Sequence, residues 1–250
     1  EGIDAEARNE FLCISAAERG GVDVTEANGA YIHSMALLAL DGSELAANGT
    51  SVIWSPRSNI SLYGNTAPVT MLAQQGVRMG LGTDWMITGS MNMLRELQCA
   101  LQLNENQYAG YFSYRDLWDM ATGGSAGAMA IDDVLGALRT GLKADISIYE
   151  AGDYADPFEA IIKAGAADVR LVMRGGMMLY GDTEVMDGVA SLQGHESCES
   201  VPNDVCGNPR SVCLSQDVGK NFAALAGANS SSYPLFHCEA PGDEPSCLPA

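Results

Sequence analysis

The strongest constraint on the fold is an alternation of strand-like and helix-like segments through the first half of the chain. Residues 29–38, GAYIHSMALL, form an apolar run that predicts a buried strand, and residues 51–55, SVIWS, predict a second. Residues 77–84, VRMGLGTD, predict a third strand. Strands that alternate with helices in this rhythm pair in parallel through right-handed crossovers. The pattern therefore predicts an α/β fold of βαβ units, with fewer than half of the strands of an eightfold barrel.

Helical segments flank these strands. Apolar periodicity or helix-forming composition predicts helices at residues 3–19, 41–49, 69–76 and 90–103. Gly76 lies at the end of the third helix, where glycine suits a C-cap. Residues 56–68, PRSNISLYGNTAP, are rich in turn formers, so we expect turns there.

The second half predicts a smaller β-structure beside the parallel sheet. Residues 114–131 predict two short helices broken at a central glycine pair. Residues 144–150 predict a strand, and residues 169–182, VRLVMRGGMMLYGD, predict a hairpin that turns at Gly175 and Gly176.

The charge of the chain limits its partners. Thirteen Lys and Arg face 32 Asp and Glu, which gives a formal net charge of -19. Such a charge repels phosphate backbones and anionic membrane surfaces, so we expect no nucleic-acid partner. No apolar run reaches the roughly 18 to 20 residues that cross a bilayer, so we also expect no membrane span.

The seven cysteines are unevenly spread. Cys13 and Cys99 stand alone in apolar sequence, where we expect buried free thiols. The other five lie in a tail rich in Ser, Asn, Pro and Gly: Cys198, Cys206, Cys213, Cys238 and Cys247. Their wide spacing and the lack of a CxxC pair favour disulfides over zinc, with one of the five free or paired elsewhere. We therefore expect an extracytoplasmic location, which means periplasmic, cell-surface or secreted.

Histidine is scarce, and only one of the three lies in the strand and helix pattern. His33 falls within an apolar strand segment, where a histidine taken alone is more often a hydrogen-bonded core residue than a catalytic one. His195 and His237 lie in the cysteine-rich tail, and we interpret them as surface residues.

Asp84 ends the third predicted strand, after two closely spaced glycines. The carboxyl ends of parallel strands are where α/β barrels place their chemistry. By position alone, Asp84 serves equally well as the N-cap of a helix over the residues that follow it.

Several motifs follow one another in a fixed order. His33 is followed by Pro-Arg-Ser-Asn at 56–59, a helix bounded by Gly76, and Gly-Thr-Asp at 82–84. A later G-x-L-x-x-G-x-x-A-D pattern at 136–145 precedes a strand. This order resembles the amidohydrolase superfamily, in the branch of chlorohydrolases and aminohydrolases such as guanine deaminase. The resemblance covers roughly residues 1 to 185.

The resemblance implies the C-terminal part of a (β/α)8 TIM-type barrel, about strands 6–8, together with strands of a small β-sandwich and a Cys-rich tail. It divides the chain into a partial barrel at 1–135, a β-sandwich return segment at 136–190 and a loop-rich, disulfide-bearing tail at 191–250. A partial barrel of this kind would leave apolar faces exposed.

The family chemistry uses a divalent metal, zinc or iron, whose bound water becomes hydroxide near neutral pH and attacks an sp² carbon. The resemblance implies that Asp84 is a metal ligand and takes the proton of the attacking water. It implies that His33 polarises the substrate or steadies the hydroxide. Ser58 and Asn59 would shape the substrate pocket or hold the turn after the second strand. Trp85 would line the pocket or pack against the fold.

The amino-terminal sequence EGIDAEARNEF looks like the segment that follows the histidine of a family His-x-x-Glu motif. The resemblance therefore implies that Glu1 shuttles protons to the leaving group, although a terminal Glu is ordinarily a frayed surface residue. The family's other metal ligands are a His-x-His pair and a further His, and this sequence has neither. We expect them from an N-terminal region outside these 250 residues, and we expect these residues alone to be an inactive fragment.

The resulting hypothesis is an amidohydrolase-type enzyme, a metal-dependent hydrolase of non-peptide C–N bonds in a small-molecule substrate. One alternative is a C–halide or cyclic-amide hydrolase of the same superfamily. Another is a non-catalytic, acidic extracytoplasmic protein that binds a partner or has a structural role.

Overall fold

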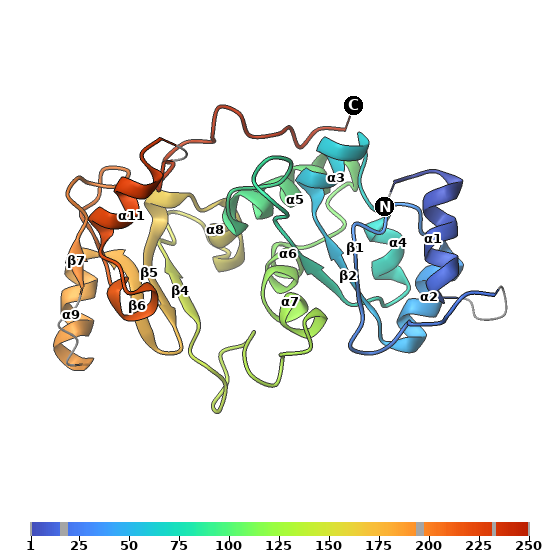
Figure 1. Cartoon of the computed structure of the whole chain (residues 1–250), viewed down its shortest axis with the longest axis horizontal. Helices are drawn as coiled ribbons and strands as arrows, with labels where there is room; N and C mark the ends of the chain where they lie inside the picture. The colour runs from blue at the N-terminus through green and yellow to red at the C-terminus, as the bar shows by residue number, and fades with distance from the viewer. Residues whose placement is uncertain (1, 16–19, 194–197, 232–233, 250) are drawn as a thin grey trace. The chain divides into compact units, whose positions relative to one another are not determined.

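The computed structural model describes residues 2–15, 20–193, 198–231 and 234–249. The chain divides into two units (Figure 1). The first holds residues 1–139 together with 243–250, and the second holds residues 140–242. No helix in these described ranges is long and apolar enough to cross a membrane.

The sheet of the first unit has three strands, all parallel, in the order β1-β2-β3. Their bounds are β1 (Ala30–Ile32), β2 (Ser51–Trp54) and β3 (Met79–Leu81). Val52 pairs with Tyr31 on one side and with Met79 on the other. The prediction of three parallel strands is confirmed.

Seven helices of the first unit fall within the described residues: α1 (Ala5–Ser15), α2 (Ala39–Asn48), α3 (Pro56–Tyr63), α4 (Val69–Gln74), α5 (Met93–Gln107), α6 (Tyr114–Ala121) and α7 (Gly123–Ala128). The first predicted helix extended to residue 19, and residues 16–19 lie outside the described residues. Gly76, expected as a helix end, has φ 80° directly after α4 and its C-cap residue.

Two of the predicted elements were wrong. The strand expected over 29–38 ends at Ile32, because His33 and Ser34 take left-handed backbone angles, φ 66° and 53°, that no strand accommodates. The turns expected over 56–68 are partly a helix, α3, because Pro56 occupies its first turn, where a missing N–H costs nothing.

The helix break expected at the central glycine pair lies at Thr122, and Gly123 and Gly124 begin α7. A Cβ on Gly124 would lie 2.2 Å from the backbone oxygen of Met79 in β3. The glycine is therefore needed for α7 to pack closely against the sheet.

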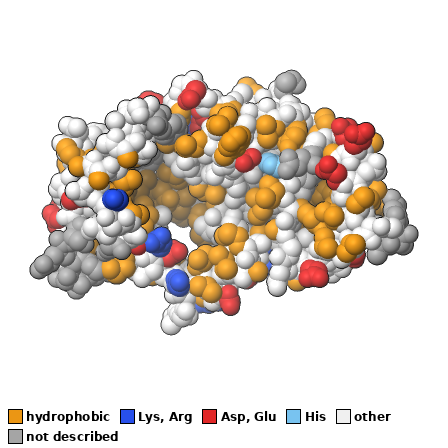
Figure 2. Space-filling view, in the orientation of Figure 1, with side chains coloured by type: hydrophobic (Ala, Val, Ile, Leu, Met, Phe, Trp, Pro, Cys, Tyr) orange, Lys and Arg blue, Asp and Glu red, His pale blue; other side chains and the backbone are white. Residues whose placement is uncertain are grey.

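The core of the first unit is formed by large apolar side chains from the strands and from α4 to α6. Those fully buried include Val52, Trp54, Leu72, Leu103 and Leu117. Apolar side chains are also exposed on this unit, as expected, with Ile32 59% exposed and Leu40 82% exposed. Figure 2 shows hydrophobic side chains, in orange, at the surface of the molecule.

The second unit has a five-stranded antiparallel sheet in the order β4-β5-β6-β8-β7. Its strands are β4 (Ile146–Tyr149), β5 (Val169–Arg174), β6 (Met177–Asp182), β7 (Glu199–Ser200) and β8 (Arg210–Val212). The described helices are α8 (Pro157–Lys163), α9 (Thr183–Gln193), α10 (Ser215–Val218) and α11 (Phe222–Asn229). The predicted hairpin is confirmed, since Gly175 and Gly176 join β5 to β6 with φ 58° and 83°.

The segment expected to be a loop-rich tail is more regular than the sequence indicated. Its strand β8 is buried and hydrogen-bonds to β6 and β7, so β7 and β8 extend the sheet of the second unit, and α10 and α11 follow them. Residues 243–249 group instead with the first unit.

The cysteines form three disulfides, Cys99–Cys247, Cys198–Cys213 and Cys206–Cys238. The expectation of two buried free thiols was wrong. Cys13 is free but exposed, because it lies on the outer face of α1. Cys99 is buried but paired, since Cys247 reaches it from the end of the chain.

Candidate active site

Four of the site residues expected from the sequence meet at the carboxyl edge of the parallel sheet. His33 directly follows β1, Ser58 and Asn59 lie in the first turn of α3 after β2, and Asp84 follows β3. Because the three strands are parallel neighbours, their carboxyl ends lie side by side. The fold therefore brings together residues that are up to 51 positions apart, from His33 to Asp84.

Asn59 fixes both the position and the tautomer of His33. The His33 ring is buried, and its Nδ1 lies 3.0 Å from Asn59 Oδ1. The Asn59 Nδ2 group faces Met35 Sδ at 2.8 Å and the His33 backbone oxygen at 3.4 Å, which sets the orientation of the amide. Because Oδ1 can only accept, Nδ1 carries a proton, and in the neutral imidazole Nε2 then has the lone pair.

The lone pair of His33 belongs to the nitrogen that faces Asp84. His33 Nε2 is 3.7 Å from Asp84 Oδ2. Ser58 Oγ donates a hydrogen bond to the same Oδ2, and the Trp85 backbone N–H donates to Oδ1 at 2.8 Å. Both carboxylate oxygens are thus held, while the side chain stays 28% exposed.

Asp84 does not cap a helix. No helix follows it before α5, whose N-cap is Asn92, and residues 85–89 form a turn closed by the Trp85 carbonyl. Asp84 and His33 both have positive φ, 56° and 66°. Non-glycine residues held in this region cluster at functional sites, where the surrounding structure compensates for the strain.

The remaining predicted residues contribute differently. Ser58 and Asn59 are fully buried, and their side chains hydrogen-bond to the side chains of Asp84 and His33. Their expected roles, shaping the substrate pocket or holding the turn after the second strand, stay predictions. Trp85 is 59% exposed beside Asp84. Glu1 lies outside the described residues.

Two contacts of this site were not predicted. Met35 accepts from Asn59, and Thr88 Oγ1 lies 3.5 Å from Ser58 Oγ. Met35 lies in the apolar run 29–38, and Thr88 lies in the turn over 85–89. Neither segment indicated a role in the site, because both contacts form only when separate strand ends meet.

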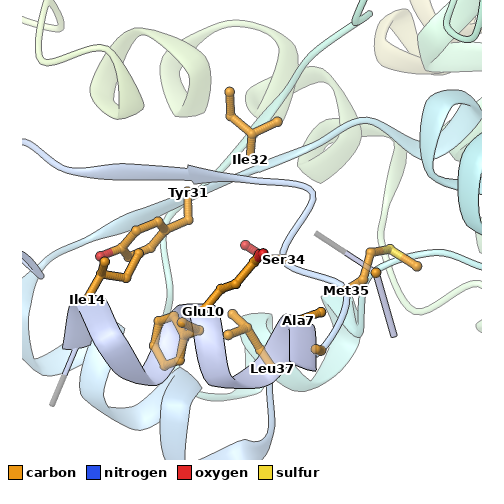
Figure 3. A pocket seen from close by; sticks show the side chains of 11 residues that line it. Ala7, Glu10, Ile14, Tyr31, Ile32, Ser34, Met35 and Leu37 are labelled. Atoms are coloured by element: carbon orange, nitrogen blue, oxygen red, sulfur yellow. The ribbon is translucent and has the colours of Figure 1, made fainter. Parts of the chain in front are cut away.

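A mostly apolar pocket lies beside the site, between α1 and the residues around the end of β1. Its wall includes Ala7, Glu10 and Ile14 from α1 and Tyr31, Ser34 and Met35 from β1 and the loop after it (Figure 3). Since Met35 also contacts Asn59, the pocket and the His33 site share a wall residue.

The donor atoms present fit one position of a divalent metal site, at Asp84. A carboxylate oxygen is an ordinary zinc ligand, and His33 Nε2 faces the same carboxylate. The hydrogen bond between His33 Nδ1 and Asn59 fixes the direction in which Nε2 points. Within the described ranges, no group of three or more His, Cys, Asp or Glu side chains could hold a metal. A complete tetrahedral site would therefore need further ligands.

Comparison with known proteins gives a consistent result. A sequence model of the amidohydrolase family matches residues 6–181. The chain is 30% identical over 185 residues to a 5-methylthioadenosine/S-adenosylhomocysteine deaminase of Desulforudis audaxviator (strain MP104C), covering 68% of this chain and 43% of that protein. It is 30% identical over 151 residues to a 5'-deoxyadenosine deaminase of Methanosarcina mazei, covering 57% of this chain and 34% of that protein.

A solved structure shows the same fold. An adenosine deaminase from Xanthomonas campestris with bound zinc superposes with a TM-score of 0.59 at 21% identity, covering 73% of this chain and 47% of that chain. The likeness indicates a TIM-barrel-type fold with mixed α and β content. The chain spans less than half the length of each of these three proteins.

Proposed function

We propose, since this chain belongs to the amidohydrolase family, that its His33 and Asp84 form part of the active site of a metal-dependent hydrolase that acts on non-peptide C–N bonds. The observation that carries the proposal is the convergence of His33 Nε2 and Asp84 Oδ2, each held by a buried neighbour, at the carboxyl edge of a parallel sheet. This edge is where α/β barrels carry out catalysis.

A divalent metal, zinc or iron, would be held in part by Asp84 and would supply hydroxide near neutral pH by lowering the pKa of water. Its other ligands would come from residues outside the described set. Asp84 would accept the proton of the attacking water at its carboxylate, which Ser58 and the Trp85 N–H keep oriented.

The tautomer of His33 favours one of its two expected roles. With the proton on Nδ1, the Nε2 atom accepts a hydrogen bond and does not donate one. This supports a His33 that holds and orients the attacking water or hydroxide, in preference to one that polarises the substrate. Trp85, exposed next to Asp84, would form part of the substrate pocket.

The relatives suggest a substrate class. Two of them are named as deaminases of methylthioadenosine, S-adenosylhomocysteine or 5'-deoxyadenosine. We therefore propose a purine nucleoside with an exocyclic amine. Water would add to the ring carbon that bears the amine, the C–N bond would break, and ammonia would leave with the proton taken from that water.

The metal and activity measurements use protein purified without a tag from its natural source, and the variants are made in that same full-length protein. Elemental analysis with intact mass would determine the metal content, and ammonia release from adenosine-type nucleosides would determine activity. Asp84→Asn should lower turnover by about 10²- to 10⁴-fold, the range for loss of a general base. Asp133→Asn, which changes an exposed turn aspartate, should leave turnover unchanged. Unchanged turnover in Asp84→Asn would refute the assigned role.

We also propose an extracytoplasmic location, periplasmic, cell-surface or secreted. Three disulfides support it, because such bonds persist in oxidising compartments. A thiol titration of unreduced native protein should find about one thiol, that of Cys13. A count near seven would contradict this location.

A further inference from the structure

A buried arginine lies directly beside the site in the sequence. Arg57 precedes Ser58 and Asn59, and only 6% of its side chain is exposed. Its Nε donates to Ser90 Oγ at 2.6 Å, and its Nη2 donates to the Arg95 carbonyl at 3.2 Å. Burial lowers the pKa of Arg57, and the nearby carboxylates of Glu244 and Glu96 act in the opposite direction.

One of those acidic groups comes from the far end of the chain. Arg57 Nη1 lies 3.3 Å from Glu244 Oε2 and also donates to the Pro245 carbonyl. Arg95 Nε donates to both oxygens of Glu244, at 2.9 and 3.2 Å. The Glu244 side chain is 7% exposed, so one buried carboxylate serves two arginines.

The segment that carries Glu244 is fastened covalently. Residues 243–249, here called the C-terminal strap, are joined to α5 through the Cys99–Cys247 disulfide. Both cysteines are buried. Helix α5 also carries Glu96, whose Oε1 accepts from the Arg57 backbone N–H at 3.2 Å. The start of α3 is therefore held from two sides, by α5 and by the strap.

That start is the part of α3 on which the site depends. Ser58 holds Asp84 and Asn59 holds His33, and both follow Arg57 within one helical turn. We propose that Glu244 is a positioning residue for the site, which fixes the first turn of α3 through Arg57 and is itself kept in place by the Cys99–Cys247 disulfide. The effect on turnover rests on the proposed function, whereas the effect on α3 does not.

The test compares Glu244→Gln with Glu150→Gln in the full chain. Glu150 also accepts from an arginine, Arg170, but its side chain is 50% exposed and lies in the second unit. Two readouts do not depend on activity. One is the hydrogen exchange of the α3 amides, and the other is the Nδ1–H signal of His33 in ¹⁵N-histidine NMR, assigned with His33→Gln.

Glu244→Gln should speed hydrogen exchange of the α3 amides by about tenfold or more. Breaking a buried ion pair lowers stability by enough to account for a change of this size. The substitution should also weaken or remove the His33 Nδ1–H signal, while Glu150→Gln changes neither. Wild-type exchange and an intact His33 signal in Glu244→Gln would overturn the proposal. So would equal effects of the two substitutions.

Further variants keep the test decisive. Glu244→Asp retains the charge, so it should restore most of the wild-type exchange. If Glu244→Gln does not fold, a double variant of Cys99 and Cys247 takes its place. Replacing both Cys99 and Cys247 with Ala should speed α3 exchange as Glu244→Gln does. Because both changes act through the strap, combining them should add little, and full additivity would contradict the proposed link.

Turnover separates this inference from the proposed function. If wild-type protein releases ammonia, Glu244→Gln should lower kcat by about tenfold with KM within about twofold, because geometry at the reacting atoms is disturbed and substrate contacts are not. Natural-source protein without turnover refutes the proposed function, and the exchange and NMR results still decide the role of Glu244.

Discussion

Replacing Asn59 with Ala tests the central contact of the site. The substitution removes the acceptor of the buried His33 Nδ1–H, and an unpaired buried donor costs about 1 to 3 kcal/mol. Asn59 is fully buried and also contacts Met35, so lost packing adds about 1 kcal/mol. We expect the free energy of unfolding of the first unit to fall by about 2 to 4 kcal/mol.

The assay is urea denaturation followed by tryptophan fluorescence. All three tryptophans, Trp54, Trp85 and Trp118, lie in the first unit, so their fluorescence reports on that unit. Asn106→Ala is the matched control, because Asn106 is exposed on α5, and it should change stability by less than about 0.5 kcal/mol. A loss for Asn59→Ala no larger than the control would refute the view that this amide anchors His33.

Three more predictions follow from the first unit. Ser58→Ala removes the hydroxyl that orients Asp84, and should lower ammonia release by about tenfold, in line with one lost hydrogen bond to a charged group. Burial raises the pKa of Glu96 from 4.5 to about 7, so its protonation stabilises the folded state below about pH 4.5 and this contribution is lost as pH rises through about 7. Urea titrations should show up to about 3 kcal/mol of this decline in wild type and none in Glu96→Gln, and equal pH profiles would contradict it. Gly124→Ala places a Cβ against Met79 and should destabilise by about 1 to 3 kcal/mol in thermal unfolding, whereas an unchanged midpoint would mean that α7 can shift freely.

The residues that meet at the site were named through the family resemblance, and strand geometry explains why they meet. The strands predicted from the sequence contained His33 and ended at Asp84. In the structure His33, Ser58, Asn59 and Asp84 each follow a parallel strand, and neighbouring parallel strands end at one edge. How they meet was not predictable. The left-handed backbone of His33 and Asp84 depends on contacts between separate strand ends, and no local pattern of residues encodes them.

The long-range contacts were the least accessible to sequence reasoning. Cys99 was expected to be free because its helix is apolar, yet its partner lies 148 residues away. Arg57 belongs to a motif that was identified, but nothing in that motif indicated Glu244. Pairings of this kind follow from the path of the whole chain in space, which composition and periodicity do not specify.

The first unit is discontinuous in the chain, and this has a consequence for its assembly. Residues 243–249 belong to it, and residues 140–242 lie between them and the rest. During synthesis the three strands β1 to β3 are made long before Glu244 and Cys247 exist. Until then Arg57 lacks its main counter-charge and Cys99 lacks its partner. No single cut of the backbone can therefore separate the two units intact, since a break at residue 139 leaves the strap on the same piece of chain as the second unit, linked to α5 through the Cys99–Cys247 disulfide.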